Sequence, residues 1–269
     1  MESSVHPEDK QLNVIIVGAG LCGLSMAISV ALAGHRVSVF EAHHETHEFG
    51  AGLQSSPNGT RIYAKWGLAD SMKSIATPPE VYEMRRFDGT VLAQRKDYDA
   101  EVHRRYSSPL WALHRVDLQE TLLRKAITLG ANISYGSKVV DVRSSETYIE
   151  LEDGSRHHAD LVVIADGVWS KLRSVVLGQQ VEARPTGDIA YRITLKKGEI
   201  KDKQVLAWMK TPRLHVWIGP GAHAVSYSVR GGEQLNLVLL ATQDFPGKES
   251  RTRGSVEELQ NIFAGWDPL

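Results

Sequence analysis

The sequence has little cysteine, little net charge and no basic amino-terminal segment, and each shortage excludes a class of protein. Cys22 is the single cysteine, which excludes an internal disulfide and is typical of a reducing compartment. The chain has 31 basic and 32 acidic residues, so the composition predicts no broad positive surface for a nucleic acid. The opening MESSVHPEDKQLN is polar and acidic, unlike a secretory signal, and we expect a cytoplasmic protein.

One uncharged run is long enough to raise the question of a membrane span. VIIVGAGLCGLSMAISVALA, residues 14–33, approaches the roughly 20 apolar residues that a spanning helix needs. Three glycines interrupt the run at a spacing that is typical of a nucleotide-binding loop, so we expect no membrane span. The composition, 42% hydrophobic and 23% charged over 269 residues, is ordinary for a globular protein of one large domain or two smaller ones.

The first forty residues predict a βαβ unit. Residues 12–17 form an apolar run rich in β-branched side chains, which is typical of a buried strand. Residues 21–33 predict a helix that Gly34 ends, and residues 36–41 predict a second short strand. A strand, a helix and a strand over about thirty residues describe a βαβ unit.

Gly18, Gly20 and Gly23 fit the pattern G-x-G-x-x-G between the predicted strand and the predicted helix. The first glycine permits a tight turn, the second lets the backbone approach a pyrophosphate, and the third lets the helix pack on the strand. The start of the helix offers N–H groups and a positive dipole end to phosphates. Glu41 ends the second strand, where an acid accepts hydrogen bonds from a ribose. The pattern predicts a dinucleotide site, and a tight turn without a ligand is the lesser alternative.

The sequence as a whole predicts two domains of different texture. We assign residues 1–180 to an α/β domain of Rossmann type, and residues 181–269, where strands follow one another between glycine-rich turns, to a mostly antiparallel β domain. The shorter elements predicted are a helix from Ser56-Pro57 to Trp66, a β meander over 81–106 with a turn at Asp88-Gly89, a helix capped by Asp117 and Glu120, a hairpin at Asp153-Gly154, and strands that include DIAYRITL, QVLAWM and LNLVLLAT.

With two later segments, the glycine pattern resembles the FAD-binding fold of the aromatic-hydroxylase type of flavoprotein monooxygenase, the family of salicylate hydroxylase. FGAGLQSSPNGTRI (49–62) is similar to the family's stretch that passes the flavin, which implies FAD contacts from Ala51 and Gly52. LHRVDLQETL (113–122) is similar to the segment whose arginine, here Arg115, touches FAD.

The segment DLVVIADGVWSKLR (160–173) resembles the family's Asp-Gly motif, although Ile164 stands where a glycine is common. The resemblance implies that Asp166 and Gly167 face the pyrophosphate and ribose of FAD, and that the same motif helps to hold NAD(P)H. A plain Asp-Gly turn is the lesser alternative. The other matched positions are Asp160, Ser170 and Arg173.

Two strands of the second domain resemble the paired strands that line the substrate pocket of family members acting on phenols. The resemblance implies that Arg192, in DIAYRITL, and Tyr227, in AVSYSVRGGEQLNLV, hold the substrate as a phenolate. A guanidinium is always charged and favours an ionised oxygen, and a tyrosine hydroxyl can donate to it. The alternative is a surface ion pair for Arg192 and simple packing for Tyr227, since alternation alone does not fix their faces.

The resemblance therefore implies an FAD-dependent monooxygenase that uses NAD(P)H and O₂ to hydroxylate a small aromatic, phenolic molecule. In this family a strand with a Gly-Asp motif follows the β-rich region, and no such motif follows residue 188. The first alternative is a truncated FAD-binding relic without turnover. A related flavin halogenase ranks lower because no lysine-bearing signature is present. We expect no metal, because the crowded His43, His44 and His47 lack a zinc spacing.

Overall fold

The computed structural model describes residues 10–45, 51–242 and 254–268. The chain forms two compact units, each with its own sheet and core. Unit 1 comprises the described part of Met1–Glu48 together with Leu118–Arg184. Unit 2 comprises the described parts of Phe49–Asp117 and Pro185–Leu269.

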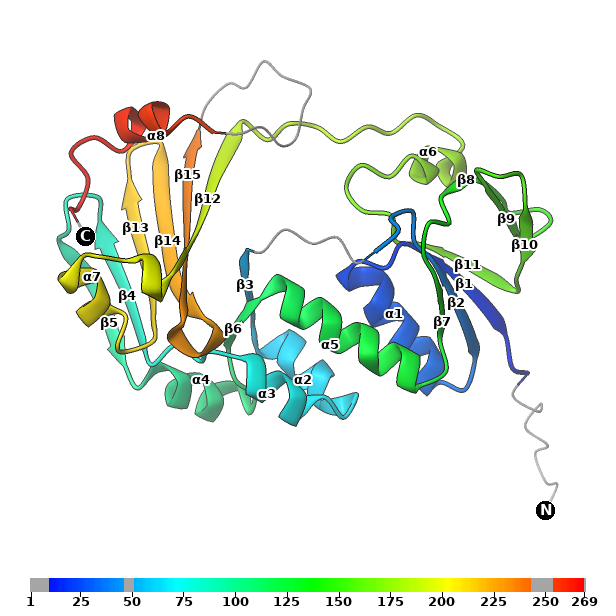
Figure 1. Cartoon of the computed structure of the whole chain (residues 1–269), viewed down its shortest axis with the longest axis horizontal. Helices are drawn as coiled ribbons and strands as arrows, with labels where there is room; N and C mark the ends of the chain where they lie inside the picture. The colour runs from blue at the N-terminus through cyan, green and yellow to red at the C-terminus, as the bar shows by residue number, and fades with distance from the viewer. Residues whose placement is uncertain (1–9, 46–50, 243–253, 269) are drawn as a thin grey trace. The chain divides into compact units, whose positions relative to one another are not determined.

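The sheet of unit 1 is parallel throughout, in the order β11-β1-β2-β7 (Figure 1). Because β1, β2 and β11 run in the same direction, the residues that follow them, Gly18, Glu41 and Ala165, lie at the same edge of the sheet. Ligands of open α/β sheets bind at this edge, outside the carboxyl ends of the strands. The strands are β1 (Asn13–Val17), β2 (Arg36–Phe40), β7 (Asn132–Ser134) and β11 (Leu161–Ile164).

Helix α1 (Leu21–Leu32) packs against β1 and β2, and α5 (Arg115–Thr128) begins in unit 2 and continues into unit 1. A core of buried side chains joins the parallel sheet to an antiparallel meander and to α6 (Leu172–Leu177); it includes Ile15, Phe40 and Ile149. The meander strands are β8 (Val139–Arg143), β9 (Tyr148–Leu151) and β10 (Arg156–His158).

The main sheet of unit 2 has six strands in the order β12-β15-β14-β13-β4-β5, and a two-stranded ribbon of β3 and β6 accompanies it (Figure 1). The strands are β3 (Gly52–Ser55), β4 (Val81–Arg86), β5 (Val91–Lys96), β6 (Trp111–His114), β12 (Asp188–Lys196), β13 (Arg213–Gly219), β14 (Ala222–Val229) and β15 (Gln234–Thr242). The helices are α2 (Pro57–Lys65), α3 (Ala69–Ile75), α4 (Tyr98–Tyr106), α7 (Lys203–Trp208) and α8 (Val256–Ile262), with short 3₁₀ turns at Lys197–Glu199 and Arg230–Gly232.

Local signals in the sequence predict several element boundaries, and the fold class is confirmed as α/β with an antiparallel β region. Ser56 is the N-cap of α2, and Pro57 is its first residue. Gly89 and Gly154 have φ angles of +88° and +83° in the hairpin turns that join β4 to β5 and β9 to β10. These angles favour glycine because a Cβ atom makes them costly.

The predicted meander over 81–106 differs from the structure in two ways. Only β4 and β5 are strands, and residues Tyr98–Tyr106 form α4. Strand β4 pairs in parallel with β13, so the hairpin belongs to the sheet of unit 2 and not to the Rossmann-type unit. The single boundary near residue 180 therefore becomes three, after residues 48, 117 and 184. A pairing between segments this far apart in the chain leaves no local signal.

Two further elements differ from the prediction. Strand β6 leads directly into α5, which begins at Arg115, so Asp117 lies in the first turn and is not a cap. The Asp117 carboxylate instead accepts from the Arg230 guanidinium at 2.6 and 2.9 Å. The predicted strand QVLAWM is helix α7, whose N-cap Asp202 accepts from the backbone N–H groups of Gln204 and Val205.

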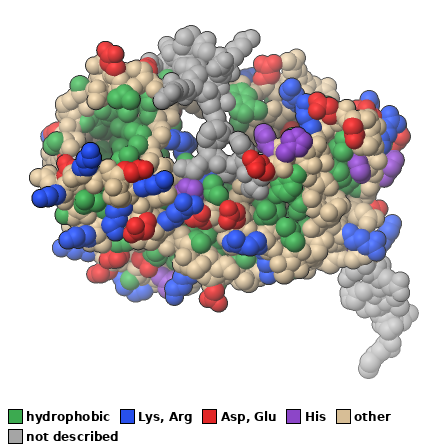
Figure 2. Space-filling model, viewed as in Figure 1, with side chains coloured by type: hydrophobic (Ala, Val, Ile, Leu, Met, Phe, Trp, Pro, Cys, Tyr) green, Lys and Arg blue, Asp and Glu red, His purple; other side chains and the backbone are tan. Residues whose placement is uncertain are grey.

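Charges of both signs are mixed over the surface that Figure 2 shows, without a continuous field of one sign. This distribution follows from the nearly balanced composition. Searched over the residues that the structure describes, the helices include none with the length and apolar content needed to cross a membrane.

Candidate functional site

The glycine loop after β1 touches the Asp166 turn, backbone against backbone. Gly18 has a φ angle of +101°, and a Cβ atom built there would lie 2.6 Å from the Ala165 carbonyl oxygen and 3.4 Å from the Asp166 Cα. A Cβ atom on Gly23 would lie 1.9 Å from the Gly18 carbonyl oxygen. Both positions therefore require glycine, and unit 1 brings the glycine pattern and the Asp-Gly motif together.

Gly20 differs from the other two glycines because no described residue beyond its chain neighbours lies close to the position of a Cβ atom on it. It is the N-cap of α1, and within the described part of the chain a Cβ atom built on it would meet no atom within 4 Å apart from its chain neighbours. The helix start has no side-chain cap and no acidic residue in its first turn. An uncapped N-terminus with open space beside it can receive phosphate oxygens, so the residues present fit the pyrophosphate of a dinucleotide.

The Glu41 carboxylate holds the glycine loop. One of its oxygens, Oε2, accepts from the backbone N–H of Ala19 at 2.7 Å, and the other, Oε1, accepts from the N–H of His43 at 2.9 Å. Each carboxylate oxygen can accept a second hydrogen bond. The ribose contact expected of Glu41 remains a prediction that this geometry allows.

Asp166 and Gly167 follow β11 at the carboxyl edge of the sheet, and Gly167 has a φ angle of +88°. The other matched positions of the motif make local contacts. Asp160 lies at the opposite end of β11 and accepts from the Asn13 backbone N–H at 2.7 Å. The Ser170 hydroxyl oxygen accepts from the Arg173 backbone N–H at 3.0 Å.

In unit 2, the remaining predicted cofactor residues lie at one end of the ribbon. The Arg115 N–H donates to the Ala51 carbonyl at 3.0 Å, and Gly52 pairs with His114. A Cβ atom on Gly52 would lie 2.7 Å from the Asn236 Cγ and 2.7 Å from the Tyr227 Cε2. The glycine therefore allows the ribbon to approach the large sheet at Tyr227.

The strand register places Arg192 and Tyr227 on one face of the large sheet. Arg192 pairs with Val238, which pairs with Val225, and Tyr227 follows two residues later. Directly paired residues share a face, and so do residues two apart in one strand. The register thus answers the question of faces that the sequence leaves open.

Arg192 is exposed, whereas Tyr227 is buried beside Leu214 and Val229. Burial raises the pKa of Tyr227 to about 12, and the positive charge of Arg192 opposes this rise. The hydroxyl therefore keeps its proton over the whole physiological range. An exposed cation and a protonated tyrosine on one face can hold an anionic oxygen, by charge and by donation.

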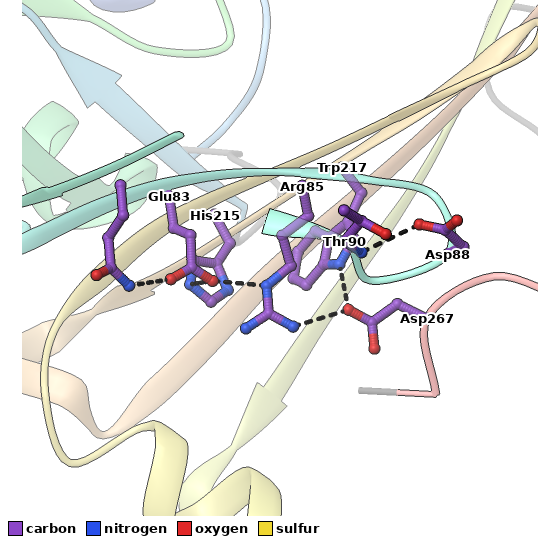
Figure 3. Close-up of polar contacts among 8 residues, drawn as sticks. Glu83, Arg85, Asp88, Thr90, His215, Trp217 and Asp267 are labelled. Atoms are coloured by element: carbon purple, nitrogen blue, oxygen red, sulfur yellow. Dashed lines mark hydrogen bonds and ion pairs between the residues drawn. The ribbon is translucent and has the colours of Figure 1, made fainter. Parts of the chain in front are cut away.

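The opposite face carries a buried polar cluster that the sequence did not predict (Figure 3). Glu83 and His215 are directly paired, 2% and 0% exposed, with the His215 Nε2 atom 3.2 Å from the Glu83 carboxylate. Arg85 connects Glu83, at 2.6 Å, to Asp267, at 3.0 Å. The Trp217 indole N–H donates to Asp267 at 2.8 Å. The cluster binds the segment after α8 to the sheet and lies on the face away from Tyr227.

Two buried amides hold the backbone of the predicted site, and sequence reasoning missed both. The Gln119 side chain donates to the Ala19 carbonyl at 3.0 Å, and the Asn236 side chain accepts from the Gly52 N–H at 2.7 Å. Each is a polar residue within an apolar surface, Gln119 beside Leu118 and Leu122 in α5 and Asn236 within LNLVLLAT. That contrast is the signal that could have found them.

Three residues named from the sequence, His47, Phe49 and Gly50, lie outside the described residues.

Comparison with known proteins shows the family of the chain. A model of the FAD binding domain family matches residues 11–263, and the chain belongs to this family. Among curated relatives, the FAD-dependent monooxygenase OpS4 of Beauveria bassiana is 40% identical over 96% of this chain and 61% of its own length. The 3-hydroxybenzoate 6-hydroxylase of Polaromonas naphthalenivorans is 30% identical over 98% of this chain and 65% of its own.

The solved structures support the fold. The crystal structure of CtdE in complex with FAD and substrate 4 superposes with a TM-score of 0.84 at 21% identity, covering 96% of this chain and 64% of that one. The chain thus spans somewhat less than two thirds of the length of the proteins it matches.

Proposed function

We propose that the chain binds FAD and acts as a monooxygenase that uses NAD(P)H and O₂ to hydroxylate a small aromatic, phenolic molecule. The observation that carries the proposal is the open N-terminus of α1 at Gly20, next to the backbone contact between Gly18 and Ala165. Bound FAD would supply the redox and oxygen chemistry. The chain's own residues would bind FAD and the substrate, orient the substrate, and exclude water from the site.

The cofactor roles divide between the two units. In unit 1, Gly18, Gly20 and Gly23 shape the loop that would receive the pyrophosphate, and Glu41 would accept from the ribose. Asp166 and Gly167 would complete the nucleotide side and contribute to holding NAD(P)H. In unit 2, Ala51, Gly52 and Arg115 would contact the flavin side.

Arg192 and Tyr227 would hold the substrate. The guanidinium favours the ionised phenol oxygen, and the Tyr227 hydroxyl, protonated because burial raises its pKa to about 12, donates to that oxygen. An ionised phenol is electron-rich, which is what transfer of an electrophilic oxygen requires. The name of one relative, 3-hydroxybenzoate 6-hydroxylase, supports a phenolic substrate class.

Binding of FAD is tested with Gly20→Ala. The backbone of Gly20, with φ −71°, accepts alanine, and the added methyl meets no atom within 4 Å among the residues that the structure describes, its chain neighbours apart. We expect a folded variant that binds FAD at least about tenfold more weakly, because the methyl occupies the space proposed for the phosphates. Flavin fluorescence titration measures this. Equal affinity of the variant and the parent chain would contradict the assignment.

Turnover is tested with Arg192→Met, measured as substrate-dependent NAD(P)H oxidation and product formation with 3-hydroxybenzoate and related phenols. We expect a loss of about tenfold or more in kcat/KM with FAD affinity unchanged, because a charged hydrogen bond to the substrate is removed. Lys196→Met is the matched control, an exposed cation on the same face of the same strand. A parent chain that binds FAD but responds to no phenol would favour the alternative of a chain without turnover.

A further inference from the structure

Ala19, the residue between the first two glycines, is held on both sides by side chains from distant elements. Its N–H donates to the Glu41 carboxylate at 2.7 Å, and its carbonyl accepts from the Gln119 amide at 3.0 Å. Ala19 itself is 4% exposed. Both bonds lie within unit 1, and together they fix the two peptide groups that flank Ala19.

The direction of these bonds decides where the neighbouring groups point. In a planar trans peptide, the C=O and the N–H point in opposite directions. Because the Ala19 N–H points to Glu41, the Gly18 carbonyl points away from Glu41, towards the position that a Cβ atom on Gly23 would occupy. By the same rule, the Ala19 carbonyl points to Gln119, so the Gly20 N–H points away from Gln119.

The burial of Gln119 indicates that packing alone does not explain an amide here. The side chain is 4% exposed, and its Oε1 atom has no hydrogen-bond partner among the residues that the structure describes. A leucine would fill a similar volume without the unsatisfied Oε1 atom, but it would leave the buried Ala19 carbonyl without the donor that the amide supplies, so the bond to Ala19 is what the amide adds over an apolar side chain. The amide nitrogen must face Ala19, since a carbonyl can only accept.

We propose that Gln119 is a positioning residue for the cofactor: it orients the Ala19–Gly20 peptide so that the Gly20 N–H faces the phosphates of FAD. The proposal rests on the proposed function, because it assigns the phosphates to the start of α1. Gln119 need not touch FAD itself. It acts through the carbonyl of Ala19, from a helix 100 residues further along the chain.

The first test replaces Gln119 by leucine, which keeps the volume and removes the donor. We expect FAD affinity, from flavin fluorescence titration of the folded chain, to fall by about fivefold, and the unfolding midpoint without FAD to fall as well, because the buried Ala19 carbonyl loses its donor. Glu120→Leu is the matched control, because Glu120 is the next residue of α5 and its side chain is 53% exposed. That control should bind FAD as the parent chain does. Unchanged affinity in Gln119→Leu would overturn the proposal.

The second test is Gln119→Glu, measured as the pH dependence of FAD affinity. A residue that acted only by packing would not produce such a pH dependence. The new carboxyl can donate to the Ala19 carbonyl only while it is protonated. FAD affinity of this variant should therefore be close to that of the parent chain at low pH and should fall as pH rises through the carboxyl pKa. The ratio of the FAD affinity of the variant to that of the parent chain should therefore fall in a single step as pH rises. A ratio that is constant with pH would contradict the proposal.

The third test needs no cofactor and separates the two proposals. Amide hydrogen exchange of the peptide around Gly18–Gly23 should speed up in Gln119→Leu without FAD, and not in Glu120→Leu, because the loop loses one of its two holds. If the parent chain bound no FAD but this exchange changed, the proposed function would fail while the positioning of the loop stood. Unchanged exchange would overturn the role of Gln119 whatever FAD does.

Discussion

Gly20 and Gly52 differ in what surrounds the position that a Cβ atom would occupy. Beside Gly20 none of the described residues apart from its chain neighbours has an atom within 4 Å of a built Cβ, whereas beside Gly52 the space is filled by Asn236 and Tyr227. The first glycine leaves room for something outside the protein. The second lets two parts of unit 2 meet. This difference separates a binding role from a packing role at the scale of one residue.

Gly52→Ala should destabilise the fold, and Gly20→Ala should not do so to the same extent. The methyl on Gly52 would lie 2.7 Å from two side chains, which we expect to cost about 1–3 kcal/mol of unfolding free energy. At the N-cap, replacing glycine by alanine should cost about 1 kcal/mol or less. Urea denaturation of both variants measures the difference. Equal losses would contradict the assignment of Gly52 to packing.

The buried His215 predicts a loss of stability in mild acid. Burial lowers the pKa of His215 to about 4, an effect that Glu83 and Asp267 oppose and that Arg85 and Arg213 reinforce. Between pH 4 and the ordinary value of 6.5, His215 is therefore protonated in the unfolded chain and neutral in the folded chain. Folding stability should fall as pH falls through this range, by up to about 1.4 kcal/mol per pH unit.

The measurement is a series of urea denaturation curves across this acidic range for the parent chain and for His215→Phe. The variant should show a shallower dependence of unfolding free energy on pH, whatever its absolute stability. Below the ordinary Glu83 value of 4.5, both chains should still lose stability, because the Glu83 pKa is lowered in the folded state. The matched control is the exposed His103, replaced by glutamine, and the change of slope in His215→Phe is compared with the change in this control. The same slope in His215→Phe would refute the assignment.

Without the resemblance to a family, spacing predicts individual site residues only where the pattern itself is local. The spacing of Gly18, Gly20 and Gly23 is a local pattern, and so its loop could be predicted. The bonds from Gln119 to Ala19 and from Asn236 to Gly52 join residues 100 and 184 positions apart. No local rule connects such pairs, and only the fold brings them together.

At the scale of elements, the sequence predicts β1, α1 and β2 because the hydrophobic runs and the glycines that end them indicate the same boundaries. It fails for α7, where the apolar run QVLAWM suits a strand as well as a short helix. The N-cap Asp202 marks α7 as a helix. Strand register is a further limit. The shared face of Arg192 and Tyr227 follows from pairings across β15, which the sequence does not reveal.

The segment after α8 offers a test of how one element is fastened to the sheet. Asp267 accepts from the Trp217 indole N–H at 2.8 Å and pairs with Arg85 at 3.0 Å, and its side chain is 8% exposed. Asp267→Ala should lower the unfolding free energy by about 2 kcal/mol, because it leaves buried donors without an acceptor. The near-ultraviolet circular dichroism of the tryptophans should change with it.

Asp88→Ala is the matched control, since Asp88 also pairs with an arginine, Arg86, in the turn of the same hairpin. Both side chains of that pair are more exposed than those of Asp267 and Arg85. Exposed ion pairs contribute little to stability, so no measurable change is expected. If Asp88→Ala were as destabilising as Asp267→Ala, burial would not be the reason for the Asp267 effect.

At the scale of the whole molecule, the proposed cofactor residues are divided between two units that each contain two stretches of the chain. Unit 1 holds the glycine loop and the Asp-Gly motif, and unit 2 holds Ala51, Gly52 and Arg115 together with Arg192 and Tyr227, the residues proposed to hold the substrate. The sequence placed one boundary near residue 180 because composition changes there. The return of residues 49–117 to the β-rich unit depends on the pairing of β4 with β13. That pairing joins segments far apart in the chain, so the local composition of the sequence does not predict it.

The division predicts how FAD should stabilise the chain. A ligand that binds only the folded state at about one hundred times its Kd adds about 2.7 kcal/mol to the unfolding free energy. If residues of both units contact FAD, then Gly20→Ala in unit 1 and Arg115→Ala in unit 2 should each reduce this gain at a fixed FAD concentration. Thermal unfolding with and without FAD measures it. Since ADP lacks the flavin, stabilisation by ADP should respond to Gly20→Ala and not to Arg115→Ala. An Arg115→Ala chain that FAD stabilises as fully as the parent would confine cofactor binding to unit 1.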